Sequence, residues 1–187
     1  MTFFDFYSVV ADFLLALPWW FLPVIFCLVF AKLLRKRFNH LPNIIKSYHR
    51  LNKFKKINDP RQQFGYLRYT NPYIYEEMIL SALNRLGYKI IRNRQYSGDG
   101  GVDGKAVING AIVLIQAKRY KKHINPKHIE EFVTICERSG HLGLFVHTGK
   151  TGPLSRSLTN QTIDIVSGQR MLELLNCRAF KMKVFKM

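Results

Sequence analysis

Three polar residues stand where two predicted strands would bring them together. Asp103 follows the glycine-rich turn SGDGG and belongs to a predicted strand. The dipeptide Asn109-Gly110 is a two-residue hairpin signal, and the returning strand AIVLIQAKR carries Gln116 and Lys118. Because side chains alternate along a strand, Gln116 and Lys118 share one face of a segment that is otherwise apolar. We therefore expect an acid, an amide and a lysine at one end of a hairpin.

This set of side chains suits the hydrolysis of a phosphodiester bond, which needs a divalent cation to neutralise the phosphate and to lower the pKa of the attacking water. Asp103 would supply the hard oxygen that Mg²⁺ prefers, with the side-chain carbonyl of Gln116 and the backbone carbonyl of Ala117 as further ligands. Lys118 would orient the water or stabilise charge at the phosphate. Asp99, in the turn, either supports the metal through other ligands or only shapes the loop.

The same residues resemble a known nuclease family over roughly residues 70 to 175. The matching segments are Tyr75-Glu76, Leu86-Gly87-Tyr88, SGDGGVDG at 97–104, IQAKRY at 115–120, VHTG at 146–149 and a closing helix at 168–175. In this order they resemble the catalytic domain of Mrr-type restriction endonucleases, in the PD-(D/E)xK superfamily. The resemblance implies a restriction-endonuclease-like α/β fold and Mg²⁺-dependent cleavage of DNA. By position, Asp103 matches the metal-binding aspartate, Gln116 the position that is Asp or Glu elsewhere in the superfamily, and Lys118 the lysine.

Glu76 matches the glutamate of the family's first helix. The helical period places Glu76 on one face with apolar residues and Glu77 on another with polar ones, as follows: Glu76 with Ile79, Leu80 and Leu83, and Glu77 with Ser81, Asn84 and Arg85. We therefore expect Glu76 to point inward, toward the site. The other interpretation of Glu76 is a solvated residue near the start of a helix, where the dipole favours acids.

Positive charge dominates the composition. The formal charge of +17 and the pI near 10.0 indicate an anionic partner, either nucleic acid or membrane headgroups. The run RYKKH directly follows the proposed catalytic lysine, and we expect its basic residues and one beyond it to follow a DNA backbone, namely Arg119, Lys121, Lys122 and Lys127. The alternative is a solvated charged face. The three cysteines have no CxxC spacing, which argues against a disulfide framework or a zinc site.

The N-terminal part predicts attachment to a membrane. Residues 13–31 contain no charge, and a span of about 13–34 would cover a bilayer core. Ten basic residues lie between Lys32 and Arg61, against the single acid Asp59. Under the positive-inside rule the chain would cross the inner (cytoplasmic) membrane once, with its N-terminus outside and the rest in the cytoplasm. The alternative is a buried core helix.

The remaining sequence predicts an α/β domain, a mixed sheet flanked by helices on both faces and preceded by one transmembrane helix. We predict strands at 88–94, 102–108, 111–119, 142–146 and 163–166, and helices at 72–86, 126–138, 153–160 and 169–175. The expected organisation is an anchor at 1–38, a basic linker with one or two short surface helices at 39–69, a nuclease domain at 70–176 and a basic tail at 177–187.

The leading hypothesis is a membrane-anchored, Mg²⁺-dependent DNA endonuclease. The first alternative is a catalytically inactive tether that binds nucleic acid and retains the nuclease fold, because a neutral Gln116 weakens metal binding. A second alternative is an interaction protein of an envelope complex. Cutting both DNA strands needs two active sites, so we also expect a homo-oligomer.

Overall fold

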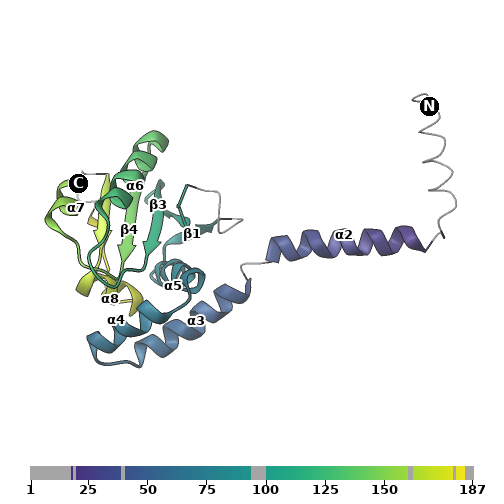
Figure 1. Ribbon diagram of the computed structural model, residues 1–187, viewed down its shortest axis with the longest axis horizontal. Helices are drawn as coiled ribbons and strands as arrows, with labels where there is room; N and C mark the ends of the chain where they lie inside the picture. Colours follow the sequence, from purple (N-terminus) through teal and green to yellow (C-terminus); the bar gives the residue numbers. More distant parts are fainter. Residues whose placement is uncertain are drawn as a thin grey trace. The chain divides into compact units, whose positions relative to one another are not determined.

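The computed structural model describes residue 18 and residues 20–38, 41–93, 100–159, 162–178 and 180–183. It separates into two compact units, residues 1–39 and residues 40–187. In the first unit, helix α2 (Phe21–Phe38; Figure 1) carries exposed apolar side chains in its first half and basic residues in its second.

No helix among the described residues is long and apolar enough to cross a membrane. The predicted span of 13–34 is therefore not found there as a membrane-crossing helix. The physical reason within α2 is its second half, which contains Lys32, Arg35, Lys36 and Arg37. Residues 13–17 and 19, which belong to the same prediction, lie outside the described residues.

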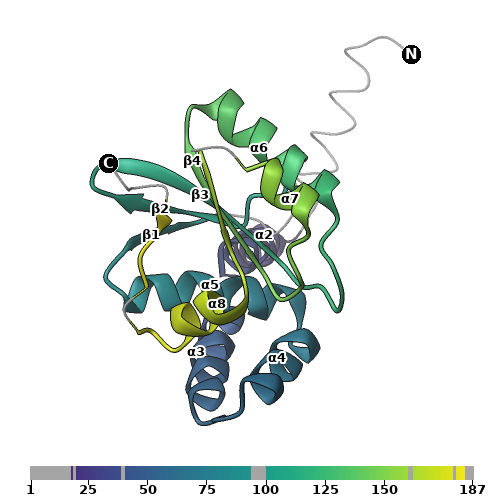
Figure 2. The same cartoon turned by 90° about the vertical axis from the view of Figure 1, so that its left-hand side faces the viewer.

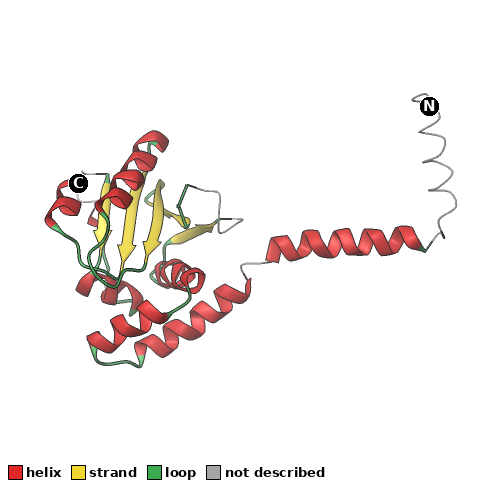
Figure 3. Cartoon of the chain, viewed as in Figure 1, coloured by secondary structure: helices red, strands yellow, loops and turns green. Residues whose placement is uncertain are grey.

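The second unit is built on a five-stranded mixed sheet, as predicted (Figure 3). Its strands follow the chain in the order β1-β2-β3-β4-β5, with bounds Lys89–Arg92, Gly104–Ile108, Ala111–Lys118, Leu142–His147 and Ile163–Val166. The pairs β1–β2 and β2–β3 are antiparallel, whereas β3–β4 and β4–β5 are parallel. The carboxyl ends of β3, β4 and β5 consequently meet at one edge of the sheet.

Helices cover both faces of this sheet (Figure 2). One face carries α6 (Pro126–Ser139) and α7 (Pro153–Ser157), and the other carries α5 (Pro72–Arg85) and α8 (Gly168–Leu175). Both α5 and α6 begin at an Asn-Pro pair, in which Asn71 and Asn125 accept hydrogen bonds from the backbone N–H two residues on. The hairpin turn between β2 and β3 has positive φ at Asn109 and Gly110, as its sequence indicates.

The segment predicted to be a linker belongs to the folded domain. It forms α3 (Leu41–Lys55) and α4 (Pro60–Tyr69), and Leu51, Phe54 and Leu67 are fully buried in the core that α5 and α8 share. The hydroxyl of Ser47 lies 2.9 Å from that of Ser81 on α5. This difference arises because the buried side chains recur three or four residues apart within a basic sequence, so one narrow face of α3 is enough to dock it.

The predicted tail also joins the domain in part. Phe180 and Met182 are buried in the same core, and the backbone N–H of Lys183 donates to Asp164 Oδ2 at 2.8 Å. Asp164 also forms an ion pair of 2.7 Å with Arg170. The polar edge of β5 is thus covered by the residues that follow α8.

Candidate active site

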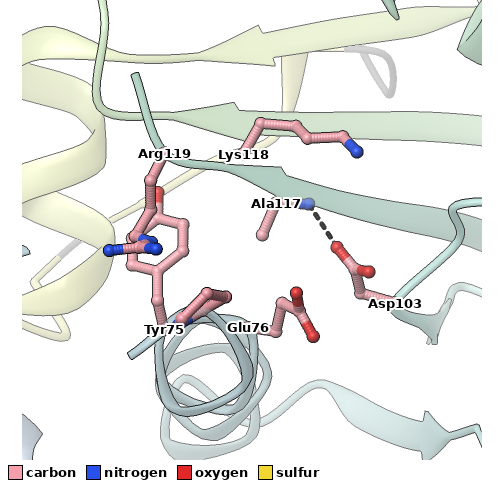
Figure 4. Close-up of a pocket in the computed structure, with 7 residues that line it drawn as sticks. Tyr75, Glu76, Asp103, Ala117, Lys118 and Arg119 are labelled. Atoms are coloured by element: carbon pink, nitrogen blue, oxygen red, sulfur yellow. Dashed lines mark hydrogen bonds between the residues drawn. The ribbon is translucent and has the colours of Figure 1, made fainter. Parts of the chain in front are cut away.

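A pocket of about 210 Å³ opens between the first turn of α5 and the carboxyl end of β3 (Figure 4). Its lining residues are Pro72, Tyr75, Glu76, Asp103, Ala117, Lys118 and Arg119. Two carboxylates and two cationic side chains therefore face one small volume. The sequence placed Asp103, Lys118 and Glu76 at one site, and the structure brings these three together.

Asp103 is held by strand β3 just before β2 begins. Its backbone N–H donates to Ile115 O at 2.8 Å, and its Oδ2 accepts from the backbone N–H of Ala117 at 2.6 Å. The carboxylate of Asp103 thus takes the place of a backbone carbonyl as the hydrogen-bond acceptor for Ala117, just before β2 begins. Burial raises the pKa of Asp103 to about 6, although the hydrogen bond from Ala117 and the charge of Lys118 act in the opposite direction.

Glu76 approaches the same pocket from α5 (Figure 4). Burial and the nearby charge of Asp103 raise its pKa to about 8, against the smaller opposing effect of Lys118. Both carboxyl groups therefore favour their neutral forms more than an exposed acid does. A pocket with two such groups attracts a cation that would replace their protons.

Glu77 is placed differently from the helical-period argument, which grouped it with polar residues. Its side chain is buried, and its Oε2 accepts a hydrogen bond of 2.8 Å from Arg92 Nε in an ion pair. Ser81, on the same face, is also buried and bonds to Arg92 Nη2. This face of α5 is covered by α3 and β1, so polar residue types there do not indicate solvent.

Gln116 and Lys118 share a strand face, but their side chains have different surroundings. Lys118 lines the pocket, whereas Gln116 is 5% exposed and is not among the lining residues. Gln116 Nε2 donates to the backbone carbonyl of Gly101 at 2.7 Å, and its buried Oε1 has no hydrogen-bond partner within the described part of the chain. Gln116 thus holds the turn before Asp103, and it keeps one buried acceptor unused.

These oxygen atoms fit a magnesium ion. Mg²⁺ is commonly held by one or two carboxylates together with waters and substrate oxygens, and Asp103 and Glu76 provide two. The unused Oε1 of Gln116 is a further oxygen, and the carbonyl of Ala117 points to the same side of β3 as its N–H, toward Asp103. Among the described residues no group of three or more His, Cys, Asp or Glu side chains could hold a metal, so such neutral oxygens would complete the set.

The predicted DNA-contacting residues fall into two groups. Lys121, Lys122 and Lys127 are exposed beyond the carboxyl end of β3. Arg119 lines the pocket, and its Nη1 also donates to the backbone carbonyls of Arg68 at 2.9 Å and Thr70 at 2.5 Å, at the end of α4. Asp99, proposed to support the metal, lies outside the described residues.

Sequence reasoning did not find the connection between α4 and the site. Besides the Arg119 contacts, Arg68 Nη2 donates to Thr148 O at 3.2 Å, just after β4. Thr148 in turn bonds through its hydroxyl to the backbone of Tyr120. No local pattern in the sequence indicates these contacts, because they join residues 28 to 80 positions apart in the chain.

The histidine at the end of β4 is a structural residue. His147 is fully buried, and burial lowers its pKa to about 4, so its ring is neutral. Its Nδ1 accepts from Gly149 N, which leaves Nε2 to donate to Thr151 Oγ1 at 3.0 Å. The ring therefore fixes the loop after β4, and His147 itself is the register partner of Lys118 on β3.

Comparison with known proteins identifies the class of domain to which this fold and pocket belong. The family model Mrr_cat, described as Restriction endonuclease, matches residues 67–175, which is more than half of the 187 residues and includes every residue lining the pocket. The chain therefore belongs to this family of restriction endonuclease domains, for which DNA is the implied substrate. A search of curated proteins found no match.

Proposed function

We propose that this chain is a Mg²⁺-dependent DNA endonuclease that hydrolyses phosphodiester bonds and is attached to the inner (cytoplasmic) membrane by its N-terminal segment, with the nuclease in the cytoplasm. The observation that carries the catalytic part is the convergence of Asp103, Glu76 and Lys118 on one pocket. Membership of the restriction endonuclease family supports the choice of DNA.

Each residue has a stated role in this proposal. Asp103 and Glu76 would hold the cation, assisted by Gln116 Oε1 and the Ala117 carbonyl. When bound, the cation neutralises the phosphate and lowers the pKa of the attacking water. Lys118 donates hydrogen bonds to the phosphate or to that water and so favours the charge that develops during cleavage. Glu76, whose pKa is raised to about 8, gives up its proton as the cation binds.

Membrane attachment rests on the N-terminal sequence and on α2. The uncharged run at 13–31 extends through the first half of α2, where Leu22, Phe26 and Leu28 are each more than half exposed. Basic residues then follow, which is the order expected of a segment whose second half faces the cytoplasm.

The catalytic proposal is tested by incubating supercoiled plasmid DNA with the full chain in detergent and Mg²⁺. Asp103→Ala and Lys118→Ala are each expected to lower the cleavage rate by on the order of 10²–10³-fold. Removing Mg²⁺ with a chelator stops the reaction, and adding Mg²⁺ back restores it. The matched control is Lys89→Ala, because Lys89 is an exposed lysine on β1 that does not line the pocket.

A second candidate is the inactive tether that binds nucleic acid. It is favoured by Gln116, which is neutral and whose amide is already bonded to Gly101. This candidate replaces the first if wild type is as inert as Asp103→Ala while both still bind DNA with a steep dependence on salt.

A further inference from the structure

The outer surface of α3 carries many positive charges and no negative ones. Residues 41–58 contain no acid, and five exposed basic residues lie in this stretch, namely Lys46, Arg50, Lys53, Lys55 and Lys56. The opposite face of the helix is fixed in the core by Leu51 and Phe54. These charges are therefore held in place on a docked helix and do not move on a free linker.

Two large apolar side chains stand at the beginning of the same surface. Leu41 is 46% exposed and Ile45 is 58% exposed. They lie four residues apart, so they are neighbours on one side of α3, and His49 and Lys53 continue the row. Apolar side chains among lysines and arginines are typical of helices that lie in the interface of an anionic membrane. There the apolar side chains insert between the lipids and the basic side chains contact the headgroups.

This surface is not an extension of the catalytic pocket. The contacts of α3 with α5 involve the second half of α5, where Ser81 bonds to Ser47 and Arg85 bonds to Asn52. Glu76, in the pocket, stands five residues before Ser81, and no residue of α3 lines the pocket. A DNA duplex in the active site would follow the exposed lysines Lys121 and Lys122, which come shortly after the pocket residue Arg119 in the chain.

We propose that the outer surface of α3 and of the turn after it, defined by Leu41, Ile45, Lys46, His49, Arg50, Lys53 and Lys56, rests on anionic phospholipid headgroups. This inference deepens the proposed membrane attachment and rests on it. Nucleic acid would also bind these positive charges, but a phosphate backbone offers no apolar surface on which the exposed side chains of Leu41 and Ile45 could be buried. A second contact of this kind holds the nuclease domain in one orientation on the membrane.

The test uses the full chain with a fluorescent label at one position. In a Cys27→Ser/Cys177→Ser background, in which the remaining Cys136 is buried, the label is attached at Ile45→Cys. The matched control carries it at Glu130→Cys, an exposed helical position on α6, on the other face of the sheet. Quenching by a headgroup-labelled lipid is measured on phosphatidylcholine vesicles with and without phosphatidylglycerol.

The label at position 45 is expected to be quenched several-fold more than the label at position 130, and only when phosphatidylglycerol is present. Lys46→Glu/Lys53→Glu should reduce this contact by on the order of tenfold or more, because each base near an anionic surface contributes roughly a fivefold factor. Lys121→Glu/Lys122→Glu changes the net charge equally and should leave it intact. Thermal unfolding checks that the variants fold.

Equal quenching at positions 45 and 130 on vesicles that the protein does bind overturns the inference and leaves membrane attachment standing. Failure of the chain to float with any vesicle overturns the attachment itself. If duplex DNA shields position 45 and phosphatidylglycerol does not, the surface binds nucleic acid and the lipid assignment is wrong.

Discussion

Asp103 and Glu76 make the site sensitive to pH, because each has a pKa above that of an exposed acid, at about 6 and about 8. A cation must displace the protons that these carboxyls hold. Mg²⁺ affinity should therefore rise as the pH rises from about 6 to about 8, by up to roughly tenfold per pH unit for each proton released. Calorimetry in buffers of different ionisation enthalpy measures the released protons directly.

The control for this prediction is Glu76→Gln, which should remove most of the pH dependence between about 6 and 8 and leave the dependence below about pH 6, which is due to Asp103. The stability of the cation-free protein should change in the opposite direction. Since both folded pKa values lie above the unfolded ones, the contribution of these groups is complete below about pH 4 and is lost as the pH rises toward 8. A Mg²⁺ affinity that is flat over this range would show that the carboxyls do not bind the ion.

Gly101 determines how Gln116 holds the turn before Asp103. Its φ is +89°, and a Cβ atom there would stand 2.6 Å from Gln116 Nε2. Gly101→Ala should therefore displace the amide that holds the turn before Asp103, and plasmid cleavage should fall by at least tenfold. Gly110→Ala is the matched control, because its φ is +80° with nothing within 4 Å.

Both glycine variants are expected to lose about 1–2 kcal/mol of stability in urea unfolding from the left-handed backbone alone. The rate of plasmid cleavage should fall only in Gly101→Ala, because only this substitution displaces the side chain of Gln116. If Gly110→Ala lowers cleavage as much, the loss reflects stability and not the position of Asp103.

The sequence predicted which residues line the pocket better than it predicted their contacts. Asp103 and Lys118 follow from a turn, a hairpin and the two-residue period, all of which are local signals. The bond from Gln116 to Gly101 and the buried pair of Glu77 with Arg92 depend on tertiary neighbours. No spacing in the sequence carries that information.

At the scale of elements, α4 is connected to the end of β3 through Arg119, which donates hydrogen bonds to the carbonyls of Arg68 and Thr70. Arg119→Ala should lower the free energy of unfolding by about 2 kcal/mol, since hydrogen bonds to charged groups contribute about 1.5–3 kcal/mol. Lys121→Ala, at an exposed neighbour, should change it by less than about 0.5 kcal/mol. Urea unfolding of the two variants makes this comparison.

A DNA-binding measurement separates the contact with DNA predicted for Arg119 from its structural role in holding α4. A residue that contacts a phosphate contributes about one to the slope of log affinity against log salt. Lys121→Ala should lower that slope by about one, and so should Arg119→Ala if it also contacts DNA. An unchanged slope for Arg119→Ala would leave it with the structural role alone.

Elements with their own start and stop signals were predicted closely, whereas the segment of α3 and α4 was expected to be a basic linker with one or two short surface helices. Asn-Pro pairs, Asn109-Gly110 and the glycine after α6 mark their boundaries in the sequence. In α3 the bases outnumber the apolar residues that are buried, so the composition suggests solvent while Leu51 and Phe54 are fully buried. Whether such a helix docks depends on the apolar surface that α5 and α8 form for it, and this surface exists only in the folded structure.

At the scale of the whole molecule, the described part of each chain contains a single Asp103 pocket, and under the proposed function such a pocket cuts one strand of DNA at a time. A double-strand break in one event then requires two chains, each with its own Asp103. Wild type mixed with equal Asp103→Ala, at constant total protein, should give about a quarter of the linear plasmid, because random pairing leaves a quarter of the dimers with two active sites. Nicked plasmid should accumulate from the mixed pairs. If linear product instead falls only by half, as it does on dilution with buffer for a chain that works alone, each chain cuts both strands independently and the homo-oligomer is not needed.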